Sequence, residues 1–371
     1  MLTNYRKYWV GFNLVKGIGA VRLGKLVDAF GDLETAWNAA PETLKAAGLS
    51  QRIVANFVQL RHDIDLTKVY DDIQAQGIRV LTWDDDDYPA RLKELDTAPP
   101  VIYLKGKLVP EDEWAVAIVG TRRITAYGRQ ITESIVRTLV RSGVTIVSGL
   151  ARGVDGIAHQ TALDAGGRTI AVLGSGLDRI YPPEHRGLAE QMIKNGALIC
   201  DYPMGTPPDA RNFPPRNRII AGLSLAIVVV EAGRKSGALI TAEFAADQGR
   251  EVFAVPGNVL APQSKGTNWL IQQGAHPLLE PEEILHTLEL TMLASQQQAR
   301  TVLPADATEA QLFALLDHQP RHVDEIRAQT NLPIEKVTAA LAMMELKGMV
   351  RQESGMRYYA VREPGTTYHT E

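Results

Sequence analysis

The stretch LAIVVVEAGRKSGALITA, residues 225–242, contains a short apolar run, a turn of small and basic residues, and the start of a second apolar segment. The run Leu225–Val230 is rich in β-branched residues, which is typical of a buried parallel strand. The small residues after it predict a turn into a helix, whose first backbone N–H groups have no partner within the helix. With Lys235 beside them, these groups are suited to an anion such as phosphate.

The segment just upstream adds more positive charge. Residues 212–220 read NFPPRNRII and contain Arg216 and Arg218, so that four cations, with Arg234 and Lys235, occur within residues 212–242. The planar guanidinium group suits bidentate contacts with phosphate. No catalytic nucleophile accompanies these cations, so we expect the segment to hold an anion rather than to break a bond.

Further strand-length runs alternate with helix-length segments from residue 115 onward. They are Val116–Val119, Val144–Val147, Ile170–Leu173, Ala197–Cys200 and Val252–Val255. This alternation predicts the fold class: an α/β, extended Rossmann-like domain with a doubly wound, largely parallel sheet.

Glycines and cations follow several of these runs, where ligands bind in such folds. These stretches are Gly120–Arg123, Ser148–Gly153, Gly174–Asp178 and Gly233–Gly237. The sequence therefore predicts one glycine- and arginine-rich edge of the sheet.

The charge is unevenly distributed along the chain. The 371 residues have a net charge of −4, yet residues 115–280 hold 17 Lys and Arg against 13 Asp and Glu, and 14 of those 17 cations are arginine. An arginine-rich surface can be merely solvated, but clustering at loop ends favours phosphate binding.

We expect four segments: a helical domain over residues 1–76, the Rossmann-like domain over 77–289, a linker over 290–305 and a winged helix over 306–371. In the first, Gly17-Ile18-Gly19 resembles a helix-hairpin-helix turn, although an ordinary tight turn fits equally well. The last is predicted from three helices and a hairpin: Glu309–Leu316, Val323–Thr330, Ile334–Lys347, and Met349–Glu353 with Met356–Val361. Residues 306–363 hold 7 cations against 9 acids, which favours a protein contact or weak DNA binding.

Other site chemistries find little support. The single cysteine, Cys200, excludes a disulfide framework, and no run is long enough to span a membrane, so we expect a cytoplasmic protein. The aspartates at 84–87 predict a solvated loop rather than a metal site. Asp155 and His159 could form an acid–base pair, but a local helix-capping role is the commoner use of such spacing.

Cofactor-binding patterns are also missing. No strand-end loop reads GxGxxG, Ser148 occupies the position of the acid that would hold a ribose, and Lys235 is not preceded by GxxxxG. We therefore expect no nucleotide cofactor, no metal and no catalytic residues.

Five ordered stretches carry a family resemblance: residues 118–122 (IVGTR), 148–155 (SGLARGVD), 173–182 (LGSGLDRIYP), 212–224 (NFPPRNRIIAGLS) and 235–241 (KSGALIT). Together they resemble the DNA-processing protein A family (DprA, also called Smf). The resemblance implies a homodimer, joined through the Rossmann-like domain, that binds single-stranded DNA. It further implies that the protein protects incoming strands in natural transformation (competence) and loads the RecA recombinase for DNA recombination.

The site residues follow from the same stretches, with Phe213 as a base-stacking platform or, alternatively, a hinge beside Pro214. We expect the DNA and its phosphates to be bound by Gly120, Arg122, Arg152, Gly176, Phe213, Arg216, Asn217, Arg218, Lys235, Ser236 and Gly237.

Two other functions compete with this one. A nucleoside monophosphate hydrolase that cleaves the glycosidic bond would share the fold, but Gly266-Thr267 lacks the glutamate that such an element carries three residues later. A transcription regulator would use the winged helix on duplex DNA, against which the acidic balance of residues 306–363 argues.

Overall fold

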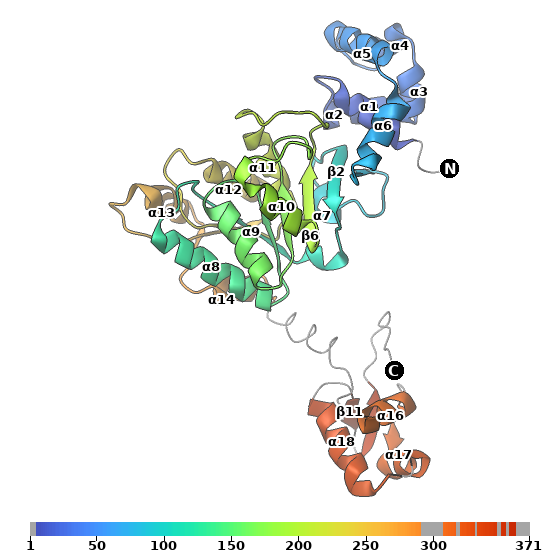
Figure 1. The fold of residues 1–371 in the computed structure, drawn as a ribbon, viewed down its shortest axis with the longest axis vertical. Coiled ribbons are helices and arrows are strands. Elements are labelled where there is room, and N and C mark those ends of the chain that lie inside the picture. The colour runs from blue at the N-terminus through green and yellow to red at the C-terminus, as the bar shows by residue number, and fades with distance from the viewer. Residues whose placement is uncertain are drawn as a thin grey trace. The chain divides into compact units, whose positions relative to one another are not determined.

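The computed structural model describes residues 5–290, 307–316, 320–330, 332–346, 350–353 and 356–360. The chain forms two compact units, Met1–Leu288 and Glu289–Glu371 (Figure 1). All but the first residue of the predicted linker lies outside the described residues. Among the described residues, no helix has the length and apolar character needed to cross a membrane.

A nine-stranded sheet organises the first unit, in the order β1-β2-β6-β5-β4-β3-β7-β8-β9. Strands β3 to β9 are parallel, whereas β2 is antiparallel to β6 and β1 to β2. The strands are β1 (Arg79–Thr82), β2 (Val101–Gly106), β3 (Ala115–Val119), β4 (Thr145–Ser148), β5 (Thr169–Val172), β6 (Gly196–Cys200), β7 (Ala226–Val229), β8 (Glu251–Ala254) and β9 (His276–Pro277).

The predicted fold class is confirmed, and the six strands predicted from residue 115 onward agree with β3 to β8 to within one residue at either end. The apolar pattern could not reveal β9, because it is two exposed residues, one of them proline.

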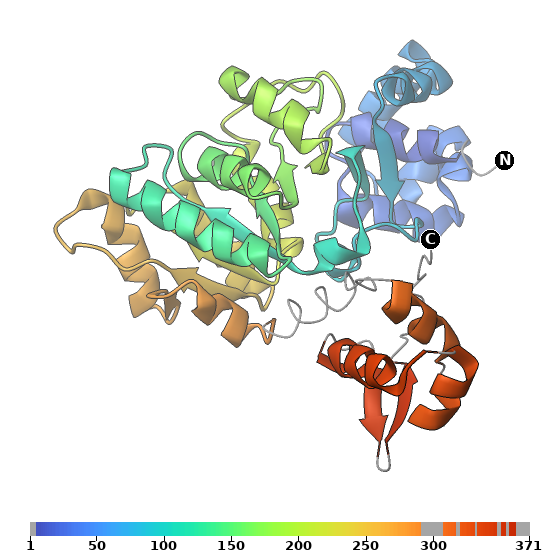
Figure 2. The ribbon, with the colours of Figure 1, turned by 60° about the horizontal axis from the view of Figure 1, so that its bottom comes forward.

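Helices cover both faces of this sheet (Figures 1 and 2). On one face, Ala115, Ala117 and Val119 of β3 share a buried cluster with Ile219 of α11 and Ala242 of α12. Figure 1 shows α8, α9 and α10 side by side on the other face. The helices are α7 (Ala90–Lys93), α8 (Ala126–Arg141), α9 (Val154–Asp164), α10 (Arg186–Met192), α11 (Phe213–Gly222), α12 (Gly237–Asp247), α13 (Lys265–Gln272) and α14 (Glu282–Thr287).

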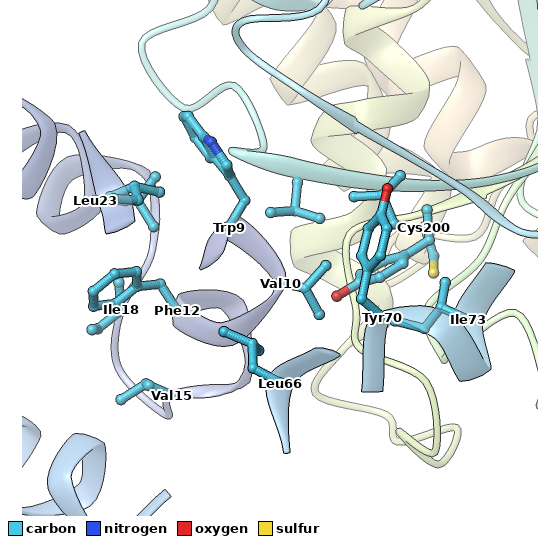
Figure 3. Close-up of a cluster of buried hydrophobic side chains, with 14 of the residues drawn as sticks. Trp9, Val10, Phe12, Val15, Ile18, Leu23, Leu66, Tyr70, Ile73 and Cys200 are labelled. Atoms are coloured by element: carbon cyan, nitrogen blue, oxygen red, sulfur yellow. The ribbon is translucent and has the colours of Figure 1, made fainter. Parts of the chain in front are cut away.

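The N-terminal helices share their hydrophobic core with one end of the sheet. Figure 3 shows Cys200 of β6 close to Tyr70 and Ile73 of the helical segment. The hydroxyl of Tyr103 in β2 donates to Asn13 Oδ1 at 3.0 Å across the same contact. These helices are α1 (Arg6–Leu14), α2 (Ala20–Phe30), α3 (Leu33–Asn38), α4 (Pro41–Ala46), α5 (Gln51–Asp63) and α6 (Leu66–Ala75).

The glycine turn of the N-terminal segment lies between α1 and α2. Gly17 has a φ of +99°, which favours glycine, and Lys16, Gly17 and Gly19 are exposed. Arg22 donates to the Gly17 carbonyl at 2.7 Å. A DNA contact by this turn stays a prediction.

The second unit is a winged helix with its own core. Leu312, Val337 and Tyr358, from three different elements, meet in one buried cluster. Its elements are α16 (Ala307–Leu315), α17 (Val323–Thr330), α18 (Ile334–Leu346), β10 (Arg321–His322), β11 (Val350–Glu353) and β12 (Arg357–Ala360). The two-residue β10, paired with β12, has no sequence signal, and Lys347, Met349 and Val361 of the predicted elements lie outside the described residues.

The prediction that residues 84–87 form a solvated loop is wrong for one residue of the four. Asp84, Asp86 and Asp87 are exposed, but Asp85 is only 7% exposed and forms an ion pair with Arg6 of α1. It also accepts the Thr82 backbone N–H at 2.7 Å. Burial acts to raise the pKa of Asp85, but the bonds from Arg6 and Thr82 outweigh it, so its pKa lies below the usual value. This carboxylate fastens the first helix to the end of β1.

We predict that Asp85→Ala lowers the free energy of unfolding of the first unit by about 2–3 kcal/mol, because Arg6 and the Thr82 N–H lose a buried partner. Asp86→Ala, the matched control on an exposed neighbour, should change it by less than about 0.5 kcal/mol. Denaturant titration followed by tryptophan fluorescence measures this, since all 5 tryptophans precede residue 288.

Because the folded-state pKa of Asp85 is lowered, its contribution is present above the ordinary aspartate pKa of about 3.9 and disappears as the pH falls below it. Equal stability of the two variants at neutral pH would contradict this role of Asp85.

Candidate nucleic-acid interface

The direction of the chain crossovers reverses between β3 and β7. From β3 the chain proceeds through β4, β5 and β6 to one side, and from β7 it proceeds through β8 to the other. In doubly wound folds, ligands bind in the crevice outside the carboxyl ends of the two strands at such a point.

A pocket of about 690 Å³ lies at these strand ends, and we call it the switch-point pocket. Its lining comes from the loops after β3, β4 and β7, from Pro208 and Ala210, and from the first turns of α11 and α12. Its polar, aromatic and glycine lining residues include Gly120, Thr121, Arg122, Asp155, Tyr181, Phe213, Arg216, Asn217, Gly233, Lys235, Ser236 and Gly237.

Close backbone packing fixes the loop that carries Arg122. The Thr121 N–H donates to the Glu231 carbonyl at 2.7 Å. A Cβ atom on Gly153, which has a φ of +76°, would lie 2.2 Å from the Thr121 carbonyl oxygen, so only glycine fits there. The loop is therefore clamped, while the Arg122 side chain remains exposed at the pocket.

A buried carboxylate supports the same loop from its far end. Glu231, at the end of β7, is 4% exposed and accepts hydrogen bonds from the backbone N–H and the hydroxyl of Thr125. Thr125 in turn caps α8 by accepting from the Gly128 N–H at 3.0 Å. The Glu231 carboxylate is therefore bound by Thr125 inside the protein, beneath the pocket.

The opposite wall is the start of α12. Ser236 caps this helix, and its hydroxyl accepts from the Ala238 N–H at 3.3 Å. The first turn contains no acid, so the positive end of the helix dipole adds to the charge of Lys235. Asn217 donates to the Gly237 carbonyl at 3.2 Å and so ties α11 to this wall.

Arg216 is a buried cation beneath the pocket. It donates to the Gly149 carbonyl at 3.0 Å and to the Val172 carbonyl, at the ends of β4 and β5. Burial lowers its pKa to about 10, so it stays charged at neutral pH, and burial likewise raises the pKa of nearby Asp155. Through these two carbonyl contacts, Arg216 stabilises the fold. The sequence pattern alone cannot distinguish this structural role from phosphate binding.

Phe213 forms an aromatic surface between the cations. The centre of its ring lies 5.2 Å from Arg122 Cζ and 5.8 Å from Arg216 Cζ, within cation–π range. Tyr181 approaches it with 5.9 Å between ring centres. A Cβ atom on Gly174 would come within 2.8 Å of the ring, so Phe213 also packs on the loop after β5.

The pocket gathers eight of the eleven residues predicted from sequence: Gly120, Arg122, Phe213, Arg216, Asn217, Lys235, Ser236 and Gly237. The other three are engaged elsewhere. Arg152 forms an ion pair with Glu184 beside a small adjoining hollow. Arg218 donates to the Asp201 carboxylate and to the Thr97 carbonyl, at 2.7 Å each. The Gly176 N–H donates to the Thr206 carbonyl. A DNA contact from any of these residues stays a prediction.

Asp155 and His159 have separate partners. Asp155 accepts from the Gly149 N–H at 3.1 Å and the Ala151 N–H at 3.3 Å, while His159 Nδ1 bonds the Thr169 hydroxyl at 2.7 Å. Burial lowers the pKa of His159 to about 3, which leaves it neutral. The two side chains do not pair with each other, so the acid–base hypothesis is wrong. The expected helix cap is also absent, because Asp155 binds N–H groups of the loop after β4, and no side chain of the described residues caps the first turn of α9.

Two contributors escaped sequence analysis. Tyr181 is exposed on the pocket and lies 32 residues before Phe213 in a loop without periodic pattern. Glu231 carries a charge at the end of a buried strand; an acid in that position is itself a signal of an internal partner.

Two family models match the chain. "DNA recombination-mediator protein A" matches residues 79–289, and "DprA winged helix domain" matches residues 296–356. Protein Smf of Synechocystis sp. is 38% identical over 395 residues, which covers 96% of this chain and 99% of that protein.

Solved structures of DNA processing protein A agree with this. The crystal structure from Streptococcus pneumoniae superposes with a TM-score of 0.67 and 32% identity, covering 76% of this chain and 97% of that one. A Helicobacter pylori structure, described for its unique single-stranded DNA binding mode, gives a TM-score of 0.52 and 31% identity, covering 57% of this chain and 95% of that one. The chain belongs to the DNA recombination-mediator protein A family, also named DprA or Smf.

Proposed function

We propose that this chain binds single-stranded DNA in the switch-point pocket, protects incoming strands, and loads RecA recombinase onto them in natural transformation and recombination. It acts in the cytoplasm as a homodimer joined through the Rossmann-like domain. The observation that carries the proposal is the convergence of Arg122, Lys235 and the N-terminus of α12 around one exposed aromatic pocket.

The electrostatics of the pocket favour an anionic ligand. Asp155 is the one acidic side chain among the described residues that line it, and this carboxylate is already bonded to two backbone N–H groups. Arg122 and Lys235 face the ligand, and Arg216 adds a buried positive charge beneath them. Cations of this kind neutralise phosphates without distinguishing bases.

The aromatic surface favours a single strand over a duplex. Phe213 and Tyr181 offer ring faces to unpaired bases, and base–aromatic stacking contributes about 1–3 kcal/mol per base. The related Helicobacter pylori protein, with its single-stranded DNA binding mode, supports the same assignment here.

The pocket offers no pair of groups for hydrolysis. Its lining carboxylate serves as a loop cap, and a glycosidic-bond hydrolase would need a free acid or base near the bound nucleotide. A binding protein without catalytic residues is therefore our proposal.

We predict that Arg122→Ala and Lys235→Ala each weaken binding of oligothymidylate and mixed-sequence strands alike, by about tenfold at moderate salt. Each should make the slope of log affinity against log salt shallower by about 0.7, because one phosphate contact is lost. Fluorescence anisotropy at several salt concentrations measures both.

Arg141→Ala is the matched control, since Arg141 is exposed at the far end of α8 and outside the pocket lining. Unchanged single-strand affinity in Arg122→Ala would show that the site is placed wrongly.

We predict a different result for Arg216→Ala, because its loss leaves the Gly149 and Val172 carbonyls buried without their donor. The thermal midpoint of the first unit should fall by several degrees, for a cost of about 2–3 kcal/mol, whereas Arg122→Ala should leave it unchanged. Tryptophan fluorescence on heating compares the two. A stable Arg216→Ala protein that has lost only DNA affinity would instead make Arg216 a direct ligand.

The recombinase and dimer parts of the proposal rest on family membership. We expect the wild-type chain to speed RecA filament formation on strands coated with a single-strand-binding protein, and Arg122→Ala to lose that effect. Light scattering should give twice the 40.6 kDa chain mass. No acceleration by a chain that binds the strand normally would reject RecA loading, and a monomer at all concentrations would reject the homodimer.

A further inference from the structure

A second basic hollow adjoins the switch-point pocket on the face of the sheet covered by α8, α9 and α10 (Figure 1). It measures about 740 Å³ and is lined by the loop after β3, by α8 and α9, and by the first residues of α10. We call it the α8–α9 groove. Arg122 lines both the groove and the pocket, so the two meet at this side chain.

Arginines dominate the charge of this groove. Arg123 follows Arg122 on the loop, and Arg129 and Arg137 project from α8, all of them exposed. Positions eight apart lie on one face of a helix, and the rise of 1.5 Å per residue separates Arg129 from Arg137 by about 12 Å along the axis. Together they form a row of cations that begins at the pocket and follows α8 away from it.

Three acids, Glu133, Asp164 and Glu184, line the groove beside its four arginines, and two of the three have a basic partner. Glu184 pairs with Arg152, which lies outside the groove lining. Glu133 lies between the two α8 arginines and approaches Arg129 at 3.8 Å, a loose contact between half-exposed side chains that is worth little in water. Asp164 lines the groove from the end of α9.

Over the described part of the chain, the groove differs from the switch-point pocket in its lack of aromatic lining residues, and this difference indicates which part of a DNA strand it can bind. None of the described residues that line the groove is Phe, Tyr or Trp; beside the charged residues they include Gly153, Gly156 and Gln160. His185 lies next to Gly156 of α9, and its Nδ1 donates to the Leu150 carbonyl, in the loop after β4, at 2.8 Å. A surface that offers guanidinium groups but no aromatic ring suits phosphates and leaves bases unstacked.

We infer that a DNA strand bound in the switch-point pocket continues over Arg122 into the α8–α9 groove, where Arg129 and Arg137 contact its phosphodiester backbone. This rests on the proposed function and extends it, because it makes the binding site longer than the pocket. The pocket holds stacked bases and their phosphates, and the groove adds backbone contacts alone. Affinity should then rise with strand length beyond the pocket.

The test uses the full chain and two oligothymidylates, one of about 6 nucleotides that fills the pocket and one of about 20 that reaches the groove. Arg129→Ala/Arg137→Ala should weaken binding of the long strand by about tenfold and make its salt slope shallower by about 1.4, for two lost contacts. Binding of the short strand should stay unchanged. Arg141→Ala, on the same helix but outside the groove lining, should alter neither affinity.

A second variant should increase the affinity for the long strand rather than lower it. Glu133→Gln removes the acid between the two arginines, so it should tighten binding of the long strand by about threefold and leave the short strand unaffected. A gain of affinity cannot arise from misfolding, so this variant separates a direct role of the groove from general damage.

The outcomes distinguish this inference from the function on which it rests. If wild type binds both strands and the double arginine variant binds the long one equally well, the strand does not enter the groove. Equal losses of affinity for both strands would place the effect in the pocket, and this result would overturn the inference. Failure of wild type to bind even the short strand would instead reject the proposed function.

Discussion

The buried guanidinium of Arg216 is the contact on which the candidate site depends. By donating to the Gly149 and Val172 carbonyls, it holds the first turns of α11 against the ends of β4 and β5. That position sets Phe213, one turn earlier on the helix, beneath Arg122, and lets Asn217 reach the start of α12. A cation that would be costly to bury alone is compensated by backbone acceptors, and its charge still adds to the positive potential of the pocket.

The cations of the site therefore fall into two groups, one buried or paired within the protein and one exposed to a ligand. Arg216 and Arg218 are occupied by acceptors within the protein, whereas Arg122 and Lys235 stay exposed on a clamped loop and at a helix start. Glu231 performs the complementary task, since it fixes the β3 loop from below and keeps its own charge out of the pocket. The site therefore combines a rigid frame with a few exposed cations, which is the arrangement that our proposal of phosphate contacts without base selection requires. The α8–α9 groove extends it with arginines that need no such frame.

Much of this could be predicted from the sequence, and the failures have physical causes. Strand-length apolar runs with glycines at their ends fixed the sheet and its functional edge, because period and turn chemistry are local properties. Which side chains form ion pairs across the fold is not a local property of the sequence. Asp85 looked like one of four solvated aspartates until the fold brought Arg6, 79 residues earlier, onto it. Arg216 and Arg122 look alike in sequence, and only packing shows that one is buried and the other exposed. Tyr181 joins Phe213 from a loop whose position no periodicity specifies.

The central claim is that phosphates of a single strand lie at the switch-point pocket between Arg122 and Lys235. A crystal structure of the chain with a short oligothymidylate tests it most directly. We predict a phosphate within hydrogen-bonding distance of the Arg122 guanidinium, another near the N-terminus of α12, and a base against Phe213. A strand bound only to the winged helix or to the turn between α1 and α2, with the pocket empty, would contradict it.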